Sequence, residues 1–201
     1  MKKVFLAIAA VVLSATTAMA QSEAGSVYIK PMVGGTLTTL TKVDDSKMKL
    51  GFVGGAEFGY QVSNEFAVTS GVLASMQGCK FKDDVYEKDR STTLTYLNIP
   101  ILANYYIVPG LAIKAGIQPG FMLSHKTKWT DTDTGVDMDI TSKDGLKKFD
   151  FSIPLGLSYE ISDFVIDARY NLGLTKISKS DINKSKNSVI MLTVGYKIPL
   201  N

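Results

Sequence analysis

Cysteine, histidine and long apolar runs are all scarce in this sequence. Cys79 is the only cysteine among the 201 residues, so no intramolecular disulfide can stabilise the fold. His125 is the only histidine, which leaves little material for a histidine-based metal site or for acid–base catalysis. After the N-terminal segment, no apolar run reaches the roughly 18 residues that predict a transmembrane helix.

A large charge of one sign is also absent, and the N-terminal segment has the pattern of a secretory signal peptide. Lys2 and Lys3 precede the unbroken apolar run Val4–Leu13, and Ala18-Met19-Ala20 is a small-x-small cleavage site. We predict that residues 1–20 are removed and that residues 21–201 form one domain. Loss of the two lysines reduces the net charge from +3 to +1, so we predict no nucleic-acid partner.

The remaining sequence has a hydrophobic period of two residues rather than 3.6, which indicates β-strands. Eight candidate strands follow from this alternation: Ser26–Leu40, Leu50–Val62, Phe66–Phe81, Leu94–Ile107, Leu111–His125, Phe149–Ile161, Phe164–Leu174 and Ser188–Leu200. Three connections are short turns, whereas the connections over 41–49, 82–93, 126–148 and 175–187 are long and polar. Short turns at one end and long loops at the other predict an all-β fold, an eight-stranded antiparallel up-and-down transmembrane β-barrel.

Each predicted strand has one apolar face and one face with charged and small residues. The charged face carries four basic and four acidic residues: Lys30, Glu57, Lys114, Asp150, Glu160, Asp167, Arg169 and Lys197. Most strand glycines share this face, and the interior of an eight-stranded barrel is only wide enough for side chains to fill it. We therefore expect the charged face to line the interior and the apolar face to contact lipid.

The tightest turn, Ser162-Asp163, tests this assignment. If Ile161 pairs with Phe164, every following pair on that face is apolar, and Gly156 lies opposite Arg169 on the other face. Aromatic residues also concentrate at two levels, as expected for the two interfaces of a bilayer. The residues near the long loops are Phe81, Trp129 and Phe149, and those near the short turns are Tyr60, Phe66, Tyr105, Tyr159, Phe164 and Tyr196.

Two local features of the strands need separate mention. Thr193, Gly195, Ile198 and Leu200 form a polar-x-Gly-x-x-apolar-x-apolar pattern, similar to the C-terminal signal that the barrel assembly machinery recognises in outer-membrane proteins. In this chain the pattern lacks the usual terminal aromatic residue. Prolines also interrupt the strands, and we expect bulges or missing ladder bonds there because a closed barrel has no free edge. These prolines are Pro31, Pro100, Pro119 and Pro154.

With the strands placed, the chain resembles the PorT-like, "porin family" outer-membrane β-barrel proteins typical of Bacteroidetes. The resemblance covers the predicted mature chain and depends on "GFVGGAEFGYQV", "YLNIPILANYYI", "AIKAGIQPGFML" and "IPLGLSYEI". It implies location in the outer membrane, and the family's namesake is linked to a protein-secretion apparatus. The resemblance provides no catalytic residues to assign to this chain.

Three groups of residues could carry chemistry, and each has a simpler interpretation. Asp167 and Arg169 could line a gated narrow polar path or a ligand site, but a network of ion pairs that fills the interior explains them better. His125 could serve a hydrolase, although Ser124 faces the other side of its strand and a loop position is the simpler interpretation. "DTDTGVD" at Asp131–Asp137 spaces acids like a calcium loop, but it lacks the glycine at the sixth position and the closing glutamate, so an extended hairpin is favoured.

The sequence therefore predicts a monomeric, non-enzymatic outer-membrane barrel without cofactor or metal. Its expected contacts are outer-membrane lipid, the assembly machinery and an extracellular ligand bound by the long loops. The lysines of the last loop could also meet anionic headgroups: Lys176, Lys179, Lys184 and Lys186. A narrow pore for small solutes and an accessory role in protein secretion remain as alternatives, although open porins need about 16 strands.

Overall fold

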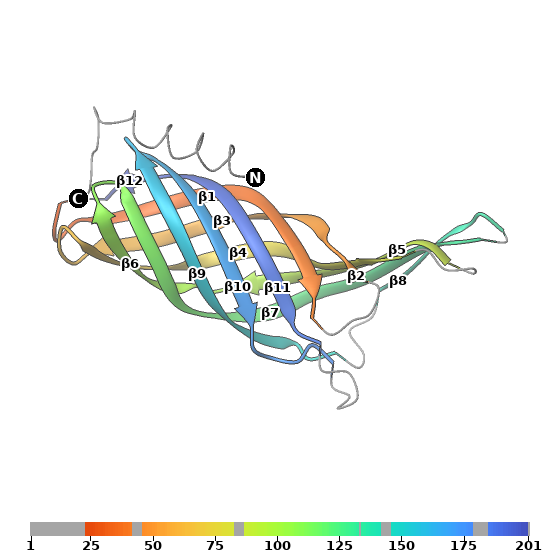
Figure 1. Cartoon of the computed structure of the whole chain (residues 1–201). Helices are drawn as coiled ribbons and strands as arrows, with labels where there is room; N and C mark the ends of the chain where they lie inside the picture. Colours follow the sequence, from red (N-terminus) through yellow and green to blue (C-terminus); the bar gives the residue numbers. More distant parts are fainter. Residues whose placement is uncertain are drawn as a thin grey trace.

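Figure 1 shows a computed structural model of the chain, which describes residues 23–41, 46–82, 87–132, 134–141, 146–178 and 185–200. Twelve strands form one sheet: β1 (Val27–Leu40), β2 (Ser46–Lys47), β3 (Lys49–Gln61), β4 (Phe66–Phe81), β5 (Glu87–Asn98), β6 (Ile101–Val108), β7 (Leu111–Asp131), β8 (Asp137–Thr141), β9 (Phe149–Ile161), β10 (Phe164–Gly173), β11 (Asn187–Tyr196) and β12 (Ile198–Pro199). No helix in the described part of the chain is long and apolar enough to cross a membrane. The predicted signal peptide, residues 1–20, lies outside the described residues.

The sheet closes into a ring because β1 pairs with both β3 and β11, all antiparallel. β5 and β6 both pair with β4 and with β7, so they are two halves of one strand, and β12 continues β11 along β1. β2 and β8 lie outside the ring. The structure therefore confirms an eight-stranded antiparallel up-and-down barrel, as predicted.

The predicted strand register is also confirmed. Ile161 pairs with Phe164, and Gly156 pairs with Arg169. The barrel strands follow the predicted ranges closely, but the predicted long loops over 41–49, 82–93 and 126–148 contain strand, which includes β2 in the first of them. β5 already begins at Glu87, and β7 continues to Asp131 and pairs there with β8, which forms the expected hairpin.

The two faces of the barrel lie as predicted. The apolar face points outward, so large side chains such as Phe52, Leu157 and Leu192 are exposed on the outer surface. All eight predicted interior charges are buried, with at most 8% of any residue exposed. Successive residues of a strand point to opposite faces of the sheet. Once one residue of a strand is assigned to the interior, the face of every other residue in that strand follows.

The inward glycines are sites of close backbone approach. A methyl group on Gly34 would overlap the carbonyl oxygen of Leu192, and one on Gly116 would overlap that of Ile101. A methyl group on the outward Gly35 would meet its nearest neighbouring atom only at 3.8 Å. The glycines on the charged face are therefore required by the small, crowded interior.

Each strand proline lies where a ladder is interrupted on one side, within the described strands. Pro100 separates β5 from β6, and the pairing of β7 with β9 skips the positions opposite Pro154. Pairing of β1 with the last strand stops at Met32 and resumes at Ile29, which leaves out Pro31. Pro119 lacks a ladder partner in β5 and β6, although its carbonyl accepts a hydrogen bond from the amide of Ile99.

Beyond the barrel, β5, β7 and β8 continue as a three-stranded sheet that projects from the long-loop end (Figure 1). A register shift at Thr95 and Tyr96 in β5 marks where β7 leaves the barrel. Beyond it, the outward positions of β7 become Lys126, Lys128 and Thr130 instead of apolar residues. The projecting sheet is therefore polar on the side that continues the outer surface of the barrel.

Candidate functional site

The barrel interior brings five of the predicted charged residues into one central cluster. Arg169 lies between two carboxylates, with its Nη1 atom 2.5 Å from Glu57 and its Nε and Nη2 atoms 2.6 and 2.8 Å from the two oxygens of Asp167. Lys30 lies 2.8 Å from Glu57, and Lys114 lies 2.5 Å from Asp167. Three cations and two anions leave this central cluster with a formal charge of +1.

Glu160 and Lys197 form a second pair nearer the short turns. Their charged atoms lie 2.6 Å apart, and the hydroxyl of Tyr106 donates a hydrogen bond of 2.7 Å to the other carboxylate oxygen of Glu160. The ammonium of Lys197 also lies 4.5 Å from the ring centre of Tyr28. Tyr28 and Tyr106 are buried partners that the charge pattern alone did not identify.

Asp150 is separate from both groups and has no ion pair with a described residue. Its two oxygens accept hydrogen bonds from the side-chain amide of Asn187 at 2.8 Å and from the backbone amide of Phe151 at 2.9 Å. The eight predicted charges balance in number, but the structure divides them into a cluster of +1, a neutral pair and a single carboxylate. Among the described residues, Asp150 therefore takes no part in the ion pairs that the sequence predicted for the interior.

A layer of apolar side chains lies next to the central cluster, on the long-loop side. Met32, Val53, Leu73 and Met191 form a buried cluster inside the barrel. Met191 pairs directly with Arg169 across β10 and β11. These four residues alternate in phase with the inward glycines, and this alternation could have predicted that they lie inside the barrel. Sequence reasoning missed them because hydrophobic residues were expected on the outer face.

The four residues of the predicted C-terminal signal lie at the closing seam of the barrel. Thr193 is buried in the interior, as is the position of Gly195, whereas Ile198 and Leu200 are exposed on the outer surface. The alternation of the pattern therefore corresponds to an inward and an outward face of the same strand.

The remaining candidates lie at the long-loop end. His125 is part of β7 rather than a loop, and its Nε2 atom lies 3.3 Å from the hydroxyl of Thr127. In the calcium-like segment, Asp131 accepts hydrogen bonds from Thr134, and Asp137 accepts one from Thr130. The described residues contain no group of three or more metal-binding side chains, and Asp133 lies outside them. Of the four lysines of the last loop that could meet anionic headgroups, Lys179 and Lys184 also lie outside the described residues.

The aromatic assignment near the long loops needs correction. Phe149 does lie at the expected level, where it packs edge-to-face on Phe121 with 5.6 Å between ring centres. Trp129 lies eight residues beyond Phe121 in β7, which is about 26 Å at ~3.3 Å per residue, and it therefore belongs to the projecting sheet. Phe81 ends β4 at the long-loop end, where its ring packs against the guanidinium of Arg90 at 5.1 Å. The extension of β7 beyond the barrel explains the position of Trp129.

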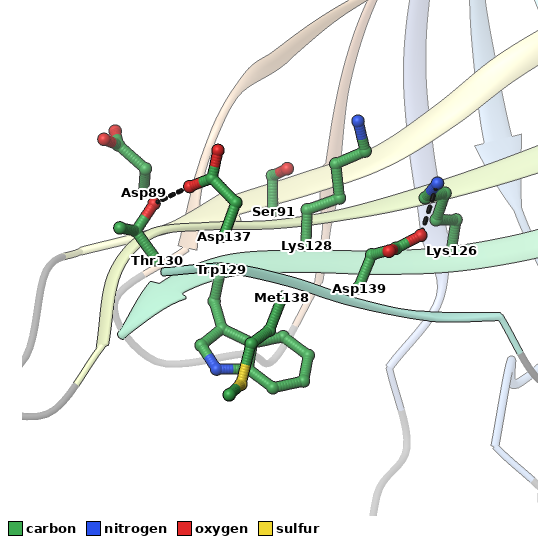
Figure 2. Close-up of a pocket in the computed structure, with 9 residues that line it drawn as sticks. All are labelled: Asp89, Ser91, Lys126, Lys128, Trp129, Thr130, Asp137, Met138 and Asp139. Atoms are coloured by element: carbon green, nitrogen blue, oxygen red, sulfur yellow. Dashed lines mark hydrogen bonds and ion pairs between the residues drawn. The ribbon is translucent and has the colours of Figure 1, made fainter. Parts of the chain in front are cut away.

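The projecting sheet presents a pocket of about 390 Å³ on its polar side. Figure 2 shows Lys126 and Lys128 on this side with Asp137 and Asp139, whereas Trp129 and Met138 point to the opposite face. Lys126 and Asp139 form an ion pair of 2.5 Å between exposed side chains. The hydrogen bond and the positive charge of Lys126 hold the pKa of Asp139 below its ordinary value of 3.8.

The chain matches one protein-family model and is similar to several solved structures. Residues 19–179 match the family model described as outer membrane protein beta-barrel domain. Among solved structures, Ail of Yersinia pestis is 20% identical, with 87% of this chain and 99% of that chain covered and a TM-score of 0.48. Neisserial surface protein A is 13% identical (86% and 97% covered, TM-score 0.49), and OprG of Pseudomonas aeruginosa is 15% identical (89% and 98% covered, TM-score 0.41). No curated protein sequence matches the chain.

Proposed function

Because the chain belongs to the outer membrane protein beta-barrel domain family, we propose that it is an outer-membrane barrel with a closed interior and a non-catalytic, surface-interaction role. The barrel would hold the projecting sheet of β5, β7 and β8 outside the membrane. In barrels of this type the short turns face the periplasm and the long connections face the exterior. The polar pocket beside Lys128 would then be accessible to extracellular molecules.

The observation that carries this proposal is the filling of the interior. The central cluster around Arg169 and the apolar layer around Leu73 occupy neighbouring levels of the same lumen. Buried ions held by several partners are costly to separate, and an apolar layer opposes a continuous water path. Eight strands leave room for side chains alone, whereas water-filled porins have about 16 strands.

The proposed contacts follow from the surfaces. The apolar outer face would contact lipid along the whole barrel, and the polar sheet outside would meet an extracellular ligand. Ile198 and Leu200 are exposed where the last strand closes the ring. The assembly machinery would bind these two side chains before β11 and β12 pair with β1. The protein would work as a monomer, because one chain closes the ring by itself.

Conductance across planar lipid bilayers tests the closed interior. We expect no channel steps when the folded protein is inserted, with insertion verified by its altered gel mobility in proteoliposomes of the same lipid. A 16-stranded porin in the same bilayers is the positive control. Reproducible conductance steps from the verified protein would overturn the closed barrel and support a narrow pore for small solutes.

A further inference from the structure

A second cavity lies at the long-loop mouth of the barrel, separate from the polar pocket of the projecting sheet. Its volume is about 320 Å³, and its walls include Leu40, Leu94, Leu146 and Ile177. Leu94 and Ile177 belong to a buried apolar cluster that closes the lumen below the cavity, with Leu40 and Leu146 packed against it. Small-molecule sites are typically cavities of this kind, mostly apolar with a few polar groups.

The cavity is lined by the uncharged polar residues Thr92, Ser178 and Ser185, and its ionisable lining residues are basic. Arg90 lines it, with its guanidinium stacked on the ring of Phe81 at 5.1 Å, and His125 lines it from β7. No Asp or Glu is among the described residues that line the cavity. The ammonium of Lys49 lies 3.0 Å from the carbonyl oxygen of Thr92, which also lines the cavity, and this adds positive charge nearby.

A β-bulge accounts for the position of Arg90. Lys88 pairs with Thr130 and Ser91 pairs with Lys128, so Asp89 and Arg90 together face one residue of β7. Asp89 has a positive φ of 51°, the left-handed conformation that such a kink uses. Asp89 lines the polar pocket on the other side of the sheet, whereas Arg90 lines the mouth cavity.

An apolar strip leads from the cavity onto the projecting sheet. Alternation along β7 places Thr127 and Trp129 on the same face as His125, and they pair with Ile140 and Met138 of β8. Figure 2 shows Trp129 and Met138 on the face away from the polar pocket. The inner face of the projecting sheet therefore carries Trp129, Met138 and Ile140 beside the polar Thr127, and it adjoins the cavity at His125.

We propose that the mouth cavity binds a single-chain amphipathic anion of the fatty-acid type. The acyl chain would pack on Leu94, Leu146 and Ile177, and the carboxylate would pair with the guanidinium of Arg90. Burial of an apolar chain and one charge-assisted hydrogen bond would both favour such a ligand over a neutral or cationic one. This site goes beyond the closed barrel, and its occupation is independent of whether the lumen conducts.

The test uses parinarate, a fluorescent fatty acid whose absorption overlaps tryptophan emission, with the folded protein in phosphatidylcholine vesicles. Trp129 is the only tryptophan of the chain, so energy transfer from it reports probe near the mouth. We expect a saturable signal for parinarate above the linear background from probe dissolved in the bilayer. Methyl parinarate, with the same chain and no charge, should bind at least about tenfold more weakly, the equivalent of 1.4 kcal/mol.

Three variants separate specific binding from partition into lipid. Arg90→Gln should weaken parinarate binding about tenfold and leave the methyl ester unchanged, whereas Leu146→Asp should remove the saturable signal for both. Lys80→Gln, which removes a nearby exposed charge outside the cavity, should have no effect. Altered gel mobility before heating verifies folding of each variant. A linear signal, or equal binding of acid and ester that Arg90→Gln does not change, would overturn the proposal.

Discussion

At the residue scale, Asp167 and Asp150 are both buried carboxylates in opposite electrostatic surroundings. Asp167 contacts Arg169 and Lys114, and its removal would leave three buried cations with only Glu57 to compensate them. Asp150 has hydrogen bonds from Asn187 and Phe151 but no ion pair with a described residue. The same chemical change should therefore have different consequences at the two positions.

We predict that Asp167→Asn lowers the free energy of unfolding by about 3 kcal/mol or more, because breaking a buried ion pair leaves charge uncompensated. Asp150→Asn should change it by less than about 1 kcal/mol or stabilise the barrel, because it removes a buried charge. The Oδ1 atom of Asn187 has no hydrogen-bond partner. The side-chain amide of Asn187 can therefore rotate so that Oδ1 accepts a hydrogen bond from the amide introduced at position 150.

Urea unfolding of both variants in lipid vesicles measures this difference. Lys148→Gln, at an exposed position, serves as the control with a change below about 0.5 kcal/mol. Equal losses for the two aspartate variants would contradict the division of the interior charges into separate groups.

At the element scale, close strand contacts depend on single glycines. We predict that Gly116→Ala prevents a stable barrel or costs at least about 3 kcal/mol, since the added methyl group would overlap the backbone of Ile101 in β6. Gly35→Ala is the matched control, because its outward methyl group would make only an ordinary van der Waals contact, at 3.8 Å, and should change stability by less than about 1 kcal/mol. Unfolding curves and gel mobility measure both, and equal behaviour would contradict the assigned faces.

The projecting sheet has a charge contact that titrates outside the membrane. The pKa of Asp139 is lowered by Lys126, so its folded value lies below its unfolded value. The small stabilisation that results is present above the unfolded pKa and is lost as the pH falls through the folded pKa.

We predict that Lys126→Gln raises the pKa of Asp139 toward its ordinary value of 3.8, as followed by NMR of the carboxyl carbon. Lys147→Gln removes an equal charge at another exposed position and should leave this pKa unchanged. An Asp139 pKa that is the same with and without Lys126 would show that the ion pair does not form in solution.

At the scale of the whole molecule, closure of the ring is the decisive property. β1 pairs with β3 on one side and with β11 and β12 on the other, so the barrel has no free edge. A closed barrel satisfies its backbone hydrogen bonds internally and resists detergent. We therefore predict that unheated and boiled samples migrate differently on a detergent gel. Identical mobility, together with purification from the periplasm without detergent, would contradict a membrane barrel.

The sequence predicted the strands most accurately where the turns were short. At Ser162-Asp163 one register keeps both faces consistent, so the partners of Ile161 and Phe164 followed directly from the alternation. The long connections offered no such constraint. Their composition is polar, but β5 and β7 continue into them because pairing with each other and with β8 supplies the missing hydrogen bonds.

The sequence by itself determined the strand count, the register at the short turns and the inward placement of the eight charges, because a period of two assigns each residue to a face. The tertiary structure decided which charges meet. Arg169 reaches Glu57 across 112 positions of sequence, and Asp150 is left apart. It also decided that the projecting sheet has its apolar face inward and that Arg90 lines the mouth cavity. These depend on distances between strands and on bulges, and hydrophobic alternation contains neither.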